Sequence, residues 1–213
     1  MYRLENETYI KNLISQGENI NLDFKYTIND SKKIAKTLSA FANTKGGRLL
    51  IGVKDNGNIA GVKTEEDYYM IEAAAQIYCK PEIKFKSKEW NIEGKEILEI
   101  TISESNDKPH FAINEEKKEI AFIRVADENI IANIINLKVW DKEKREKGLK
   151  IKYSETENIL LKYLEKNENI SLLNFMKVAK ISRHKAIETL SDLIVLQLID
   201  CIYINKKPLF KLK

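Results

Sequence analysis

The sequence predicts an α+β protein of two parts, a larger mixed-sheet domain followed by a small helical domain that ends in a β-ribbon. The apolar spacing changes in the order helix, strand, helix and then a run of strands, which is typical of helices gathered mainly on one face of a mixed sheet. A charged run from Asp141 to Gly148 contains no apolar anchor. Beyond this run the pattern changes to three short helices and two strands. We therefore expect domains at 1–140 and 151–213, joined by a charged linker at 141–150.

Each element of the first domain has a local signal. Helices are indicated where apolar residues recur at helical spacing, and strands where apolar and polar residues alternate or an apolar run is short. Thr64 is the expected N-cap of the third helix, and Pro81 ends it. Glu93-Gly94 lies between two alternating segments and predicts a hairpin. The expected elements are helices at 5–16, 32–43 and 64–79, strands at 21–26, 49–53, 83–90, 95–102 and 120–125, and a helical exit at 128–144.

The segment from Ala40 to Gly57 joins a helix end, two glycines, a buried strand and an acidic turn. Gly46 and Gly47 supply the positive-φ backbone that a helix C-cap requires. The strand that follows is apolar enough to be buried on both faces, and Asp55-Asn56-Gly57 is a turn signal. This compact arrangement indicates a site.

Short motifs on both sides of this segment follow the order of a known family. Gly17-Glu18 and Leu22-Asp23-Phe24-Lys25 precede it, and Lys108-Pro109-His110-Phe111 and the stretch from Phe122 to Asn129 follow it. Over residues 17 to 140 these motifs resemble the Schlafen-type AlbA-like domain, also described as a divergent AAA-like, ATP- or DNA-binding domain of bacterial regulators. Asp23 stands where Glu is usual in that family. The resemblance implies a fold on which several activities occur.

The resemblance also implies a nucleotide or phosphate site at the glycine-rich loop. Backbone N–H groups of such a loop can cradle phosphate, and ATP is the candidate ligand. The sequence has no GxxxxGK(S/T) motif, and its two glycines follow a helix and precede a strand, the reverse of a P-loop. A helix C-cap explains the glycines without a ligand. The candidate phosphate-binding residues are Asn43, Thr44, Lys45, Gly46, Gly47 and Arg124.

Three carboxylates form an alternative, catalytic hypothesis. Schlafen-like nucleases hold a divalent ion for RNA cleavage with two acids five residues apart and a third after the glycine-rich strand, and Glu18, Asp23 and Asp55 have a similar arrangement. Mg²⁺ or Mn²⁺ would bind there, because hard cations prefer oxygen ligands and activate water. The opposing interpretation makes Glu18 and Asp55 turn residues and pairs Asp23 with Lys25 or a backbone donor.

The pattern of the second domain is that of a winged helix-turn-helix. Ser154 opens a capping box with Glu157, and Ser171 and Ser182 are the expected N-caps of the next two helices. Two strands around residues 205–208 would form the wing. The expected elements are helices at 155–164, 172–179 and 183–196 and strands at 198–204 and 209–212.

Charge indicates a polyanion partner for this second domain. Residues 145–213 contain 14 Lys or Arg against 8 Asp or Glu, whereas residues 1–144 contain 22 against 24. In a winged helix the third helix enters the major groove and the wing meets phosphate. DNA is therefore favoured, with RNA as the alternative, and a homodimer would allow half-site recognition. Docking of a protein partner is the competing interpretation. The candidate DNA-binding residues are Lys180, Arg183, His184, Lys185, Lys206 and Lys207.

Composition indicates a cytoplasmic protein that does not enter membranes. Cys79 and Cys201 are too far apart for a CxxC metal clip and are expected to be reduced thiols. The N-terminus has no signal-peptide h-region, and no apolar run reaches the length of a membrane span. The sequence thus predicts a nucleic-acid-binding transcriptional regulator. The alternatives are a metal-dependent ribonuclease and an ATP-binding or protein-interaction adaptor.

Overall fold

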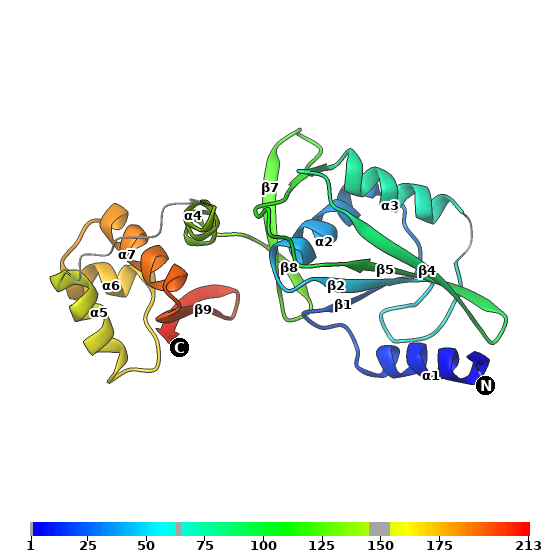
Figure 1. Ribbon diagram of the computed structural model, residues 1–213, viewed down its shortest axis with the longest axis horizontal. Helices are drawn as coiled ribbons and strands as arrows, with labels where there is room; N and C mark the ends of the chain where they lie inside the picture. Colours follow the sequence, from blue (N-terminus) through cyan, green and yellow to red (C-terminus); the bar gives the residue numbers. More distant parts are fainter. Residues whose placement is uncertain (1, 63–64, 145–153) are drawn as a thin grey trace. The chain divides into compact units, whose positions relative to one another are not determined.

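The computed structural model describes residues 2–62, 65–144 and 154–213, and for residues 2–6 the backbone only (Figure 1). The chain divides into two compact units, Met1–Ile131 and Ala132–Lys213. Within the described ranges no helix is both long enough and apolar enough to cross a bilayer. The predicted α+β class with a mixed sheet is confirmed.

The first unit is built on a four-stranded mixed sheet in the order β1-β2-β5-β4. β1 is parallel to β2, and the other neighbours are antiparallel. Glu93 and Gly94 both have positive φ and connect β4 to β5, so the predicted hairpin is confirmed. The strand bounds are Leu22–Lys25 for β1, Gly47–Ile51 for β2, Phe85–Ile92 for β4 and Lys95–Ile102 for β5.

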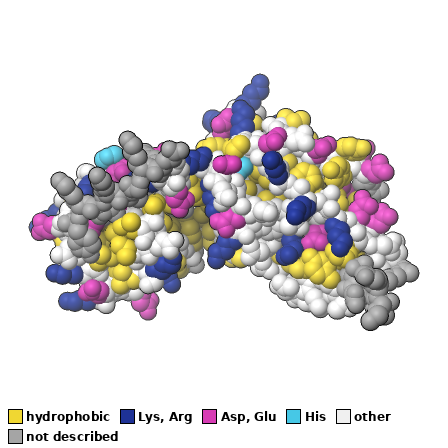
Figure 2. All heavy atoms as spheres, in the orientation of Figure 1, with side chains coloured by type: hydrophobic (Ala, Val, Ile, Leu, Met, Phe, Trp, Pro, Cys, Tyr) yellow, Lys and Arg dark blue, Asp and Glu magenta, His cyan; other side chains and the backbone are white. Residues whose placement is uncertain are grey.

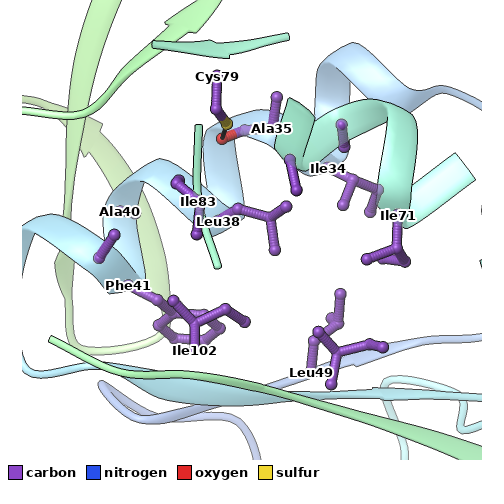
Figure 3. Close-up of a cluster of buried hydrophobic side chains, with 14 of the residues drawn as sticks. Ile34, Ala35, Leu38, Ala40, Phe41, Leu49, Ile71, Cys79, Ile83 and Ile102 are labelled. Atoms are coloured by element: carbon purple, nitrogen blue, oxygen red, sulfur yellow. Dashed lines mark hydrogen bonds between the residues drawn. The ribbon is translucent and has the colours of Figure 1, made fainter. Parts of the chain in front are cut away.

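Helices cover both faces of this sheet rather than mainly one (Figure 1). Successive strand residues point to opposite faces, so Leu49 and Ile51 pack under one set of helices while Leu50 packs on the other side. Helix α1 (Tyr2–Ser15) packs on the Leu50 face, and helices α2 (Ser31–Asn43) and α3 (Glu66–Gln76) cover the opposite one. Figure 3 shows the latter cluster, which includes Leu38, Phe41, Leu49, Ile71 and Ile102.

The first unit also contains a second, antiparallel sheet of four strands. The sequence predicted only one of them, the strand at 120–125. The order of this sheet is β3-β6-β7-β8, and α2 packs against it. The helical exit expected at 128–144 is wrong at its start, because Glu128–Ile131 forms β8 and pairs with β7. The third helix ends at Gln76, before the short strand β3, and its expected cap Thr64 lies outside the described residues. The bounds are Cys79–Lys80 for β3, Phe111–Ile113 for β6, Glu119–Val125 for β7 and Glu128–Ile131 for β8.

The second unit contains four helices and one hairpin among its described residues. Ser171 and Ser182 cap their helices as predicted, and Ser154 forms the expected capping box with Glu157. Strands β9 and β10 are antiparallel, and Asn205 and Lys206 at their turn have positive φ. The bounds are Ile134–Glu143 for α4, Glu155–Leu164 for α5, Leu172–Ala179 for α6, Arg183–Val195 for α7, Ile199–Ile204 for β9 and Lys207–Leu212 for β10.

Helix α4 belongs to the second unit, so the boundary lies earlier than the sequence suggested. Ile135 and Val139 of α4 join the apolar core that α5, α6 and α7 share. Lys142, which the sequence placed in a linker, is buried and donates to Ser191 Oγ and Asp192 Oδ1, both at 2.7 Å. Residues 141–143 are therefore helical, and 145–153 lie outside the described residues.

Candidate functional site: a buried polar network and two basic surfaces

The glycine-rich loop is the connection between α2 and β2. Gly46 has φ +68°, and its N–H donates to the carbonyl of Phe41 at 2.9 Å, so it ends the helix. A Cβ on Gly46 would lie 2.7 Å from the carbonyl oxygen of Ile102. A Cβ on Gly47 would lie 2.4 Å from the Phe41 ring. Close packing therefore requires both glycines, and backbone conformation requires Gly46 as well.

The Asn43 side chain has a structural role, because it connects α2 to neighbouring backbone segments and is not open to a ligand. It is buried at the last turn of α2, and its Nδ2 donates to the carbonyls of His110 at 2.8 Å and Phe122 at 2.9 Å. Its Oδ1 accepts from the His110 N–H at 2.7 Å. The side chain therefore pairs backbone groups beside β6 and in β7. Both of its N–H donors are used, and it is 3% exposed, so it is not placed to bind a nucleotide.

The two residues that follow Asn43 have different roles: Thr44 forms internal hydrogen bonds, and Lys45 lies on the surface. The Thr44 hydroxyl donates to Ala40 O at 2.7 Å and accepts from the Arg124 N–H at 2.9 Å. Lys45 is exposed. Of the loop side chains predicted to bind phosphate, Lys45 alone points to solvent.

Arg124 is also committed to the interior. It is 3% exposed, and its Nη2 lies 3.3 Å from Asp23 Oδ1. Its Nε donates to the carbonyl of Asn19 at 3.2 Å and its Nη1 to Asn129 Oδ1 at 3.0 Å. The prediction that Arg124 holds a phosphate does not fit this geometry, since the guanidinium is buried and bonded on three sides.

Glu18 and Asp23 do come together, and the pKa values of their carboxyls shift in opposite directions. Burial, followed by the hydrogen bond with Asp23, raises the pKa of Glu18 to about 7. Burial opposes ionisation of Asp23 as well, but the hydrogen bond from Glu18 and the charges of Lys25 and Arg124 keep the pKa of Asp23 below its usual value. Lys25 Nζ lies 3.2 Å from Asp23 Oδ1 and 3.8 Å from Glu18 Oε1.

The third carboxylate does not complete a metal site with this pair. Asp55 is exposed in the turn after β2. Across the described ranges, no group of three or more His, Cys, Asp or Glu side chains is placed to hold a metal ion. The Glu18 and Asp23 carboxyls face two cations, Lys25 and Arg124, so their negative charge is already compensated. The donor set for Mg²⁺ or Mn²⁺ that the sequence suggested is therefore not assembled in this structure.

The predicted DNA-binding residues of the second unit are all exposed. Arg183, His184 and Lys185 form the first turn of α7, where the Ser182 hydroxyl accepts from the Lys185 N–H. Lys206 and Lys207 lie at the turn of the β9–β10 hairpin, and Lys180 ends α6 in the left-handed conformation. Lys185 Nζ is also 3.8 Å from Glu157 Oε1.

One face of the first unit carries cations that were not predicted from the sequence. Lys86, Lys88 and Trp90 alternate along β4 and therefore share one face of the sheet with Arg48 of β2. They line a hollow of about 550 Å³ together with Tyr9, Ser87, Glu99 and Thr101. The spacing of two residues between Lys86 and Lys88 could have indicated from the sequence that both lysines lie on one face of a strand. On the view in Figure 2, Lys and Arg side chains of the first unit lie grouped around a hydrophobic patch.

Comparison with known proteins gives a family match and distant structural neighbours, including the two that follow. Residues 18–133 match the family model described as Schlafen, AlbA_2. The DIP2311 protein from Corynebacterium diphtheriae aligns at 16% identity and TM-score 0.46, over 70% of this chain and 30% of that one. The N-terminal domain of a protein described as related to the ATP-dependent DNA helicase RecG, from Nitrosomonas europaea, aligns at 16% identity and TM-score 0.38, over 68% and 97%. No curated protein matches the chain.

Proposed function

The chain belongs to the Schlafen AlbA_2 family, and from this premise we propose that it is a nucleic-acid-binding transcriptional regulator that acts in the cytoplasm. In this proposal the second unit is a winged helix that binds DNA. The observation that carries it is the exposure of five cationic or titratable side chains at two places, the first turn of α7 and the tip of the β9–β10 hairpin. These are the elements with which a winged helix contacts bases and phosphates.

Base contacts in this proposal are confined to the first turn of α7. Glu188, one turn further on, pairs with Lys138 at 2.9 Å and with Lys142 at 2.8 Å, both on α4. Its carboxylate is thus occupied and does not contact a cytosine amino group. Arg183 and Lys185 remain as the side chains that reach base edges, and Lys206 and Lys207 contact phosphate.

The test is a selection of bound sequences from a random duplex library, followed by affinity measurements over a range of salt. Arg183→Ala/Lys185→Ala should relax the sequence preference, at about 1–3 kcal/mol for each bidentate contact. Lys206→Ala/Lys207→Ala should weaken all duplexes alike and reduce the salt slope by about 1 for each phosphate no longer neutralised. Lys162→Ala/Lys166→Ala, with equal charge loss on exposed residues of α5 and just beyond it, is the control. Identical behaviour of all three variants would overturn the proposal.

The ribonuclease alternative is checked with the same protein. RNA incubated with the chain and Mg²⁺ or Mn²⁺ should stay intact, because the three carboxylates do not form a group that could hold a metal. Cleavage that is lost in Asp55→Ala and kept in Asp107→Ala, a change at another exposed aspartate, would restore the catalytic hypothesis.

A further inference from the structure

The exposed part of the first sheet contains a second cationic surface, independent of the second unit. Arg48, Thr101 and Lys86 form one row across β2, β5 and β4, and Lys88 lies in the next row, opposite Glu99. Lys86 and Lys88 are exposed, and the Arg48 side chain is 43% exposed. Helix α1 covers the neighbouring part of the same face, where its residues pack on Trp90 and Ile92. The hollow therefore lies beside Tyr9, in the middle of α1, and extends over β2, β5 and the edge strand β4.

A buried carboxylate holds Arg48 of this surface directly, and it also bonds the Trp90 ring that lies under Lys88. Glu99 is 4% exposed and accepts from the Tyr9 hydroxyl at 2.8 Å and from Trp90 Nε1 at 2.8 Å. It also forms an ion pair with Arg48, whose Nε lies 3.1 Å from Glu99 Oε1. The Arg48 side chain is held against this carboxylate and is still 43% exposed. Lys88 Nζ lies 3.7 Å from the centre of the Trp90 ring. Glu99 and Trp90, at the floor of the hollow, thus hold the side chains of Arg48 and Lys88 in place.

We propose that this surface, defined by Arg48, Lys86, Lys88 and Thr101, binds the phosphodiester backbone of a single-stranded nucleic acid. Charge complementarity decides the class of partner, because the hollow has three cations and one carboxylate, and that carboxylate is already satisfied. The Thr101 hydroxyl lies between Arg48 and Lys86 in the row and adds a neutral donor.

The spacing indicates a strand rather than an isolated phosphate. Neighbouring strands are about 4.8 Å apart, so the backbones at Arg48 and Lys86 are separated by about 10 Å, and Lys88 is about 6.7 Å further along β4 than Lys86. Three cations at these distances can each contact a different phosphate along one chain, whereas a single anion could not reach all three. The contacts are expected to be independent of base sequence, since Trp90 is 7% exposed beneath Lys88 and does not present its ring for stacking.

The test is binding of a fluorescent thymidine 12-mer by the full-length chain, measured by anisotropy over a range of salt. Lys86→Gln/Lys88→Gln should weaken binding by about tenfold at low salt and reduce the salt slope by about 0.7 for each phosphate no longer neutralised. Lys33→Gln/Lys117→Gln, which removes the same charge from exposed residues of α2 and of the turn between β6 and β7, should bind like the wild type. Both variants change only exposed side chains and keep the Arg48–Glu99 pair, so little loss of stability is expected.

Binding by the second unit is removed by repeating the comparison with Arg183, Lys185, Lys206 and Lys207 all changed to Ala. Unchanged duplex preference in this background, with Lys86-dependent binding of the 12-mer retained, would contradict the winged-helix proposal alone. Equal affinities for the two Gln variants would overturn the sheet surface alone. Competition by polyglutamate as strong as that by an unlabelled 12-mer would indicate an acidic protein partner and would also overturn it.

Discussion

The guanidinium of Arg124 lies 3.3 Å from the carboxylate of Asp23, with both side chains buried. Arg124 belongs to β7 and Asp23 to β1, so this ion pair joins the two sheets of the first unit. The residue that the sequence suggested as a phosphate ligand therefore has a structural role. The Phe41 ring, whose centre is 5.3 Å from the guanidinium carbon, packs beside the pair.

Arg124→Met is expected to lower the free energy of unfolding by about 3–5 kcal/mol, because it leaves the buried Asp23 carboxylate without one of its partners. Urea denaturation measures this change. Lys45→Met, an exposed position in the loop that precedes β2, should stay within about 0.5 kcal/mol of the wild type. Similar losses for the two variants would show that Arg124 is dispensable to the fold.

Gly46→Ala should destabilise the first unit more than Gly94→Ala does. Both glycines have positive φ, so both substitutions cost about 1 kcal/mol from backbone conformation. Nothing lies within 4 Å of a Cβ at Gly94, whereas a Cβ at Gly46 meets backbone atoms of Ile102 and Glu104 at 2.7 and 2.8 Å. Thermal or urea unfolding of the two variants separates the conformational cost from the collision. Equal losses would mean that the loop can shift without cost.

Glu18 should make the first unit less stable as pH rises through neutrality. Its pKa in the folded protein is about 7, above its ordinary value of 4.5, so the folded state binds the proton more tightly. The stability that this group contributes is fully present below pH 4.5 and is lost as pH rises through 7. Glu18→Gln keeps an oxygen for the Phe24 N–H, which now bonds Glu18 Oε1 at 2.9 Å. Relative to this variant, the wild type should lose stability as pH rises from about 5 to about 8, which spans the pKa of Glu18. A constant difference would contradict the raised pKa.

Lys142→Met should destabilise the second unit and reduce its sensitivity to acid. Hydrogen bonding from Lys142 lowers the pKa of Glu188 to about 2, below its ordinary value of 4.5. The stability contributed by Glu188 is therefore present above pH 4.5 and lost as pH falls towards 2. Without the Lys142 ammonium this acid-dependent loss should shrink. Unfolding curves at several acid pH values measure it, and Lys144→Met, at an exposed neighbour, is the matched control.

The sequence predicted the elements with strong local signals. Periodicity located α1, α2 and α7, turn chemistry located the hairpin at Glu93-Gly94, and serine caps located three helices of the second unit. It failed for strands β3, β6 and β8, which are two to four residues long. Strands this short contain too few alternations to show a period, and β6 and β8 are stabilised by pairing with β7.

The sequence identified the polar residues of the candidate site, but it did not predict the role that each of them has in the structure. Glu18, Asp23 and Arg124 do converge, yet as a network with Lys25 in which Asp23 and Arg124 are buried. Side-chain spacing along a sequence does not reveal which polar group ends inside a fold, because burial depends on the sheet that covers it. The basic residues of α7 and the hairpin were simpler to place, since exposed positions follow directly from the apolar stripe on the other face.

The packing of α4 onto the second unit has a spectroscopic consequence. The chain contains two tryptophans, Trp90 in β4 and Trp140 in α4, so each unit has its own intrinsic fluorophore. Trp140→Phe leaves an emission signal from the first unit alone, and Trp90→Phe leaves one from the second. Denaturation of a protein with two units need not be a single transition. With one indole removed at a time, the unfolding of each unit can be followed in the intact chain.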